Sequence, residues 1–188
     1  MNEQRSGIKQ LTTTAVCIAL CVALPMAFHA IPNAGSIFSP MHIPVLICGL
    51  SCGPVYGLIC GILGPVLSSV LTGMPGMGYL PVMIVELAAY GLLCGLFIRL
   101  IRTGKPYINL YASLILAMLA GRVIAGAFRA ILWTPGEYAL AAWVSGYFVT
   151  SLPGILIQLA IIPGIVLALM KARLIPAALP AGTEQMPG

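Results

Sequence analysis

Two arginines lie inside a stretch of the sequence that is long and apolar enough to cross a lipid bilayer. Residues 111–133 read YASLILAMLAGRVIAGAFRAILW, and their only charged residues are Arg122 and Arg129. An arginine near the centre of a bilayer costs roughly 2.5–3.5 kcal/mol on insertion scales. At ~100° per residue, positions seven apart share one helix face, about 20° and ~10 Å from each other. Both guanidinium groups must therefore face something polar.

A carboxylate lies in the preceding apolar stretch, residues 80–101, which contains Glu86. The short segment 102–107 joins the two stretches, so we expect them to form antiparallel neighbouring helices. At 1.5 Å per residue, Glu86 would lie ~9 Å from the outer end of its helix, Arg129 ~6 Å and Arg122 ~16 Å. Glu86 can then reach one arginine. Two interpretations stay open, namely a structural Glu86–arginine pair, and a binding site in which an arginine meets water or an anionic ligand.

Other polar and aromatic residues lie toward the outer ends of the predicted helices. The further candidates for ligand binding are Asn33, His42, Tyr79, Trp133, Trp143, Tyr147 and Gln158. Trp143 and Tyr147 are four residues apart, on one helix face, and could stack on a ligand or simply pack. Most of these residues also have an interpretation without a ligand. Aromatic residues near the interface commonly anchor a helix there, and an interfacial histidine is commonly solvated. Gln158 is expected to hydrogen-bond another helix.

Motifs for catalysis and metal binding are missing from the sequence. It contains no Walker A or H-E-x-x-H pattern and no aspartate. The letters GLSCG (49–53) fit G-x-S-x-G, but they lie in a predicted membrane helix and not at a strand-to-helix turn, so no nucleophile elbow is expected. A membrane enzyme would have to use Ser68, Ser69 or His42, and nothing in their spacing indicates this. The six cysteines lie in apolar runs and are expected to be small buried thiols in reduced form. We therefore expect no enzyme activity, metal or cofactor in this chain.

The composition indicates which elements position these residues. The chain has 188 residues, of which 60% are hydrophobic and 7% charged, whereas soluble domains average ~25% charged residues. This predicts an all-α membrane protein with one bundle. The expected helices span about 8–30, 42–53, 55–71, 80–101, 111–133 and 139–170. The expected organisation is a cytoplasmic segment 1–7, a six-helix transmembrane domain 8–172, and a flexible cytoplasmic tail 173–188.

The basic residues at or beyond the ends of the predicted helices predict the orientation. With six spans they all fall on one side of the membrane; they are Arg5, Lys9, Arg99, Arg102, Lys105, Lys171 and Arg173. The positive-inside rule then places both termini in the cytoplasm. The predicted outer connections 31–41 and 72–79 carry no charge.

Alanine recurs at every fourth position of the first predicted helix, at Ala15, Ala19, Ala23 and Ala27. Such a stripe gives a smooth face that another helix can approach closely. This pattern alone does not distinguish packing inside the bundle from docking of an external partner helix.

Several segments together resemble the substrate-binding S components of energy-coupling factor (ECF) vitamin transporters. They are MHIPVLICGLSCGPVYGLICGILGPVLSSVLTGMP (41–75), VELAAYGLLCGL (85–96), LAGRVIAGA (119–127) and LPGILIQLAIIPGIVLAL (152–169). The resemblance covers about residues 8–172. It implies a six-helix bundle in the bacterial plasma membrane, with both termini inside and an outward-facing pocket gated by residues 31–41.

The resemblance also implies partners and a mechanism. Ala15, Ala19 and Ala23 match the A-x-x-x-A surface that docks the transmembrane coupling protein in this family. That protein carries two cytoplasmic ATPases, whose ATP hydrolysis drives the S component to topple in the membrane with its vitamin. The alternative is a membrane subunit that transports nothing.

The charge of the predicted site indicates the class of ligand. Glu86, Arg122 and Arg129 together carry a charge of +1, which favours a small anion bound by charge-assisted hydrogen bonds. Pantothenate is the first candidate, because the resemblance is greatest to that branch and the molecule combines a carboxylate with hydroxyl and amide groups. Lipoate, niacin, folate and a flavin stay open, and thiamin is disfavoured because it is a cation.

Overall fold

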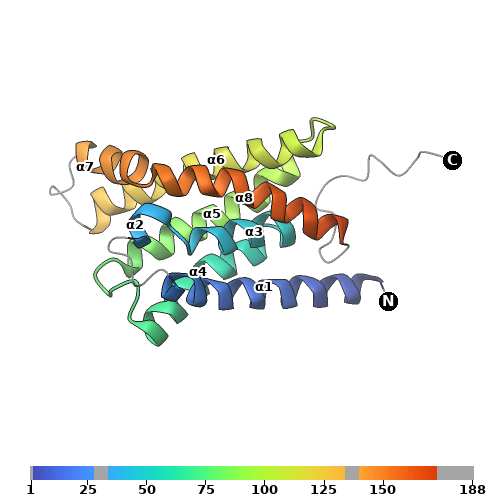
Figure 1. Ribbon diagram of the computed structural model, residues 1–188, viewed down its shortest axis with the longest axis horizontal. Helices are drawn as coiled ribbons and strands as arrows, with labels where there is room; N and C mark the ends of the chain where they lie inside the picture. The colour runs from blue at the N-terminus through green and yellow to red at the C-terminus, as the bar shows by residue number, and fades with distance from the viewer. Residues whose placement is uncertain (1, 28–33, 134–139, 173–188) are drawn as a thin grey trace.

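The computed structural model describes residues 2–27, 34–133 and 140–172, and all regular structure in these ranges is helical (Figure 1). The helices are α1 (Asn2–Ala27), α2 (Ala34–Phe38), α3 (His42–Cys52), α4 (Pro54–Thr72), α5 (Leu80–Leu100), α6 (Pro106–Phe128), α7 (Leu140–Val144) and α8 (Leu152–Lys171). Two π-helical turns, η1 (Arg129–Trp133) and η2 (Ser145–Thr150), follow α6 and α7.

Five of the described helical segments are long and apolar enough to cross a membrane, and the shorter α3 packs among them. They lie in α1, α4, α5, α6 with η1, and α8. This confirms the predicted all-α membrane bundle, including the short second helix, which ends where Gly53 adopts a positive φ of 95° and Pro54 begins α4.

The helix boundaries differ from the prediction in four places. Helix α1 begins at Asn2 and α6 at Pro106, both several residues early. The segment 31–41 contains α2, which was predicted as an irregular connection. The last predicted helix is divided into α7, η2 and α8, and the division falls where Pro153 occupies the first turn of α8, a position that needs no amide donor.

Glycines bring α3, α4 and α5 into backbone contact. A Cβ atom on Gly57 would collide with the carbonyl of Gly91, and one on Gly91 with the carbonyl of Gly57. A Cβ atom on Gly61 would likewise collide with the carbonyl of Leu87, and one on Gly49 with the carbonyl of Gly91. Small residues of this kind allow membrane helices to approach closely. They hold α5, which carries Glu86, at the centre of the bundle.

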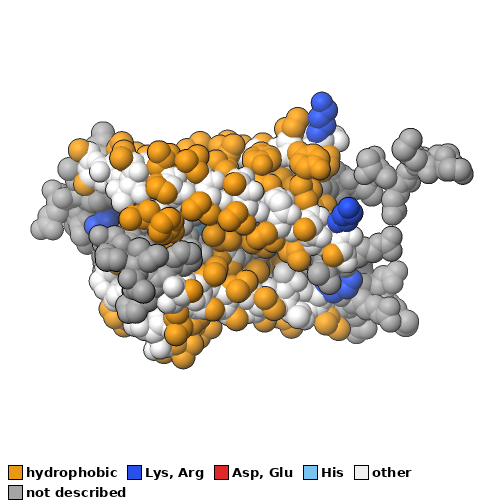
Figure 2. Space-filling model, in the orientation of Figure 1, with side chains coloured by type: hydrophobic (Ala, Val, Ile, Leu, Met, Phe, Trp, Pro, Cys, Tyr) orange, Lys and Arg blue, Asp and Glu red, His pale blue; other side chains and the backbone are white. Residues whose placement is uncertain are grey.

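The exposed basic side chains of the described residues gather at one end of the bundle. The start of α1, the α5–α6 connection and the end of α8 lie together at the right of Figure 1, and Figure 2 shows Lys and Arg side chains at that end. The exposed basic residues there are Lys9, Arg99, Arg102, Lys105 and Lys171. The positive-inside rule predicts that this end is cytoplasmic. In that orientation α6 runs outward and α8 inward.

The glycine contact gives a test of the fold. We expect Gly91→Leu to lower the thermal unfolding temperature of the detergent-purified protein, because overpacking costs typically 1–3 kcal/mol and here the obstacle is backbone. The matched control is Gly164→Ala, since Gly164 is exposed in α8 with open space around its Cβ position. Equal unfolding temperatures for Gly91→Leu and the wild type would contradict this packing.

Candidate functional site

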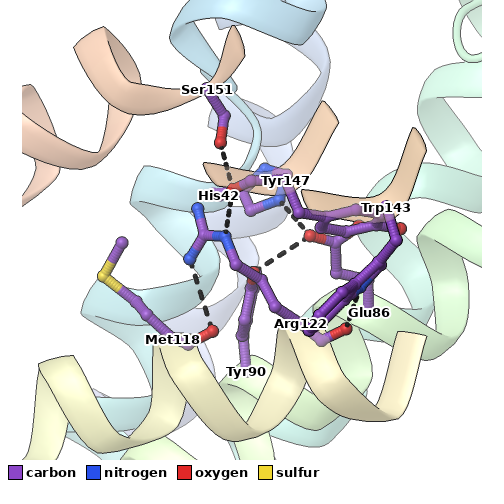
Figure 3. Close-up of polar contacts among 8 residues, drawn as sticks. All are labelled: His42, Glu86, Tyr90, Met118, Arg122, Trp143, Tyr147 and Ser151. Carbon is purple, nitrogen blue, oxygen red and sulfur yellow. Dashed lines mark hydrogen bonds and ion pairs between the residues drawn. The ribbon is translucent and has the colours of Figure 1, made fainter. Parts of the chain in front are cut away.

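Arg122 lies buried in the outer half of α6, with 3% of its surface exposed. Its Nε atom donates a hydrogen bond to the carbonyl of Tyr147 at 2.9 Å, and Nη1 donates to the carbonyl of Met118 at 3.3 Å (Figure 3). A guanidinium group has five N–H donors. Three of them are therefore left over from these two hydrogen bonds.

The π-helical turn η2 supplies the carbonyl that Arg122 binds. In an α-helix the backbone N–H of Ser151 would donate to the carbonyl of Tyr147, four residues earlier. Here it donates to the carbonyl of Val149 instead. The carbonyl of Tyr147 consequently accepts hydrogen bonds from Arg122 and from the Ser151 hydroxyl, the latter at 2.6 Å. Local π-helical turns are frequent at functional sites.

Aromatic rings cover the Arg122 guanidinium. Its central carbon lies 5.7 Å from the centroid of the Tyr90 ring and 6.0 Å from that of Phe148. Both distances fall within the range of cation–π attraction. Trp143 donates its indole N–H to the Arg122 carbonyl at 3.3 Å and packs edge-on against Phe148. The charge is thus held by ring faces and backbone carbonyls.

Glycines on either side of Arg122 make room for these rings. A Cβ atom on Gly121 would overlap the Tyr90 ring, and one on Gly126 would overlap the Trp143 indole. The motif GRVIAG, residues 121–126, therefore places one cation between two small residues so that large rings can lie against the helix.

Glu86 is buried beside this cation, with 4% of its surface exposed. Its Oε1 atom accepts a hydrogen bond from the Tyr90 hydroxyl at 3.0 Å and lies 3.3 Å from Nε2 of His42. No arginine among the described residues lies within ion-pair distance of Glu86, so the structural Glu86–arginine pair, one of the two interpretations that the sequence leaves open, is not found there. Tyr90 lies one helical turn along α5 and occupies the space between Glu86 and Arg122, so its hydroxyl binds the carboxylate and its ring faces the guanidinium.

Arg129 lies at a second, outer level of the same helix pair. It is half-buried at the start of η1, and its guanidinium carbon is 5.7 Å from the ring centroid of Tyr79, just before α5. Arg122 faces Tyr90, further along α5. The two arginines thus face one helix at two depths, as their spacing predicts, and Glu86 lies between those depths in the α5 sequence.

His42 and Gln158 are more buried than the sequence indicated. His42 has 4% of its surface exposed, so it is not a solvated interfacial histidine, and its ring packs on Tyr90 with centroids 5.2 Å apart. Gln158 is fully buried in α8, and neither of its amide atoms has a hydrogen-bond partner in the described part of the chain. Its predicted hydrogen bond to another helix is therefore absent from the described residues.

The structure brings His42, Glu86, Arg122, Trp143 and Tyr147 together in one cluster (Figure 3). Tyr79 lies with Arg129 at the outer end and is 38% exposed. Asn33 and the side chain of Trp133 lie outside the described residues. A ligand-binding role for these residues stays a prediction.

Sequence reasoning missed Tyr90, Phe148 and Ser151 as members of the cluster. Tyr90 had a signal, because it follows Glu86 by four residues and so shares its helix face. Phe148 and Ser151 had none, since their positions depend on the π-helical turn.

The alanine stripe lies on the outer surface of α1. Ala15, Ala19 and Ala23 are exposed, whereas Thr14, Cys17 and Cys21 form the buried face of the same helix, which packs on α3 and α4. The six cysteines are all buried free thiols. The structure therefore leaves the stripe accessible, and its docking role stays a prediction.

Comparison with known proteins gives one match. The family model described as "ECF transporter, substrate-specific component" matches residues 9–166, which is most of the chain. No curated protein and no solved structure matches. The helical bundle and its membrane-length apolar helices agree with an integral protein of the bacterial plasma membrane. The chain therefore belongs to the family of substrate-specific components of ECF transporters.

Proposed function

We propose that this subunit binds a small anionic vitamin or vitamin precursor with high affinity and carries it inward, with pantothenate as the first candidate. The observation that supports this most directly is that the Arg122 guanidinium is buried with no carboxylate beside it in the described part of the chain. It is buried in a membrane helix, and no carboxylate among the described residues lies within ion-pair distance of its guanidinium. A buried cation of this kind is costly unless an anion compensates it.

The chemistry of the cluster fits a carboxylate ligand with further polar groups. The three remaining N–H donors of Arg122 can form charge-assisted hydrogen bonds with a carboxylate, and Arg129 adds a second cation nearer the outside. Hydroxyl and amide groups of pantothenate could then pair with Glu86 or Gln158. Lipoate, niacin, folate and a flavin are alternative ligands that offer an anionic or polar group to the same residues.

The proposed transport step depends on partners. The stripe of Ala15, Ala19 and Ala23 would dock the transmembrane coupling protein, and ATP hydrolysis in two cytoplasmic ATPases would topple the subunit with its ligand. Exposure of the stripe supports this role, because small side chains let another helix approach closely. The uncharged α4–α5 connection also supports it, since this connection would have to pass through lipid. Helix α2 rests on the start of α8 beside Gly154, at the outer end where a gate is needed.

Arg122 gives the test of ligand binding. We expect Arg122→Ala to weaken binding of pantothenate, or of another vitamin found by a thermal-shift screen, by about 10- to 150-fold. This range corresponds to ~1.5–3 kcal/mol for hydrogen bonds to a charged group. Isothermal titration of the folded, monodisperse variant measures it. Lys105→Ala, exposed at the cytoplasmic end, is the control. Unchanged affinity in Arg122→Ala would refute the role of this residue, and absence of any saturable vitamin binding would favour a subunit that transports nothing.

The alanine stripe gives the test of docking. We expect Ala19→Trp to abolish vitamin uptake by cells that express the complete transporter, because an indole would hold the partner helix away from α1. Binding by the isolated variant should be unchanged. Ile115→Trp, on an exposed face of α6, is the matched control for a large residue facing lipid. Normal uptake by Ala19→Trp would exclude this surface as the docking site.

A further inference from the structure

The histidine of the cluster has a buried nitrogen without a partner. His42 opens α3, and its Nε2 atom lies 3.3 Å from Oε1 of Glu86 (Figure 3). Its other nitrogen, Nδ1, is buried and has no hydrogen-bond partner among the residues that the structure describes. An unpaired buried polar atom costs free energy, typically about 1–3 kcal/mol. Such an atom beside a buried cation is therefore a candidate for ligand contact.

The contacts of Glu86 fix which nitrogen carries the hydrogen. Oε1 already accepts the hydrogen bond from the Tyr90 hydroxyl. The same oxygen is the neighbour of Nε2, and an ionised carboxylate has no hydrogen to donate, so Nε2 of His42 is the donor to it. A neutral imidazole has a single N–H. In the neutral ring, Nδ1 is therefore a bare acceptor with a lone pair.

The charged side chains around His42 determine whether the negative charge of a bound anion would be compensated. The elements packed on α3 are α1, α4, α5 and α8. Their buried titratable side chains in the described residues are Cys17, Cys21, Cys60, Glu86, Tyr90 and Cys94. Ordinary thiols and phenols are uncharged at pH 7, and α8 contributes only the neutral amide of Gln158 to this buried set. Glu86 and, from α6, Arg122 are thus the fully buried charges beside His42, and they sum to zero. The half-buried Arg129 adds its positive charge at the outer level.

An anion that reaches the inner level of the site, where Glu86 offsets Arg122, meets a lone pair at Nδ1 and leaves an excess negative charge there. Protonation of the imidazole removes both obstacles, because both nitrogens of a cationic imidazole are donors. Nε2 then keeps its hydrogen bond to Glu86 while Nδ1 gains a hydrogen for the ligand. Histidine is the side chain whose charge changes most readily near neutral pH.

We propose that Nδ1 of His42 contacts the anionic group of the ligand, and that ligand binding is coupled to uptake of a proton from solvent by the His42–Glu86 pair. This inference rests on the proposed function and adds to it a second ligand contact and a linkage to pH. Because a proton enters with the ligand, affinity rises as pH falls, by at most about tenfold per pH unit. The linkage belongs to the coupled pair of groups.

The test is isothermal titration of the full-length protein with pantothenate at pH 7.5, in phosphate and in Tris. These buffers differ in ionisation enthalpy, so proton uptake appears as a difference in observed heat. We expect net proton uptake by the wild type and a dissociation constant that rises between pH 6 and pH 8. His42→Gln should still bind, more weakly, with no proton uptake and a flat pH profile. His29→Gln, which replaces the other histidine of the chain, should behave as the wild type.

The outcomes separate this inference from the proposed function. Binding without proton uptake by the wild type would overturn the inference and leave the anion-binding function standing. Proton uptake that persists in His42→Gln, or disappears in His29→Gln, would also overturn it. If pantothenate fails to bind, lipoate, nicotinate and folate are titrated in the same buffers, and failure of all of them would reject the function and the inference together.

Discussion

The buried charge of Arg122 is the constraint on which the rest of the site depends. A guanidinium group at this depth in a membrane helix has to be surrounded by polar groups and ring faces. The π-helical turn η2 provides the carbonyl of Tyr147, and Gly121 and Gly126 let Tyr90 and Trp143 lie against α6. These contacts solvate the cation without neutralising it. Arranged in this way, the guanidinium keeps the positive charge that the proposed anionic ligand would meet.

Close packing at glycines holds in place the helix that carries Glu86 and Tyr90. Backbone contact between α4 and α5 at Gly57 and Gly91 fixes the helix that carries Glu86 and Tyr90. The packing of α3 on the same helix brings His42 to Glu86. Helix α1 lies on the other side of α3 and α4, away from the cluster, and leaves its alanine face exposed. The proposed ligand site and the proposed docking surface therefore lie in separate parts of one bundle.

The sequence predicts the bundle well because hydropathy, chain breaks and basic residues are local signals. The Gly53-Pro54 break and the one-sided distribution of lysines and arginines are read directly from it. The partner of Glu86 could not be predicted, since counting residues gives depth along a helix but not the rotation of its neighbours. The burial of His42 and the π-helical turn at Tyr147 likewise depend on how several helices pack.

The account claims that a cationic site, solvated by rings and carbonyls, selects its ligand by negative charge. The most direct measurement compares the dissociation constants of pantothenate and its neutral alcohol, pantothenol, for the purified subunit at one pH and ionic strength. The two ligands differ only at the carboxylate. The account predicts that pantothenate binds at least about tenfold more tightly, which corresponds to ~1.4 kcal/mol. Equal affinities for the acid and the alcohol would contradict it.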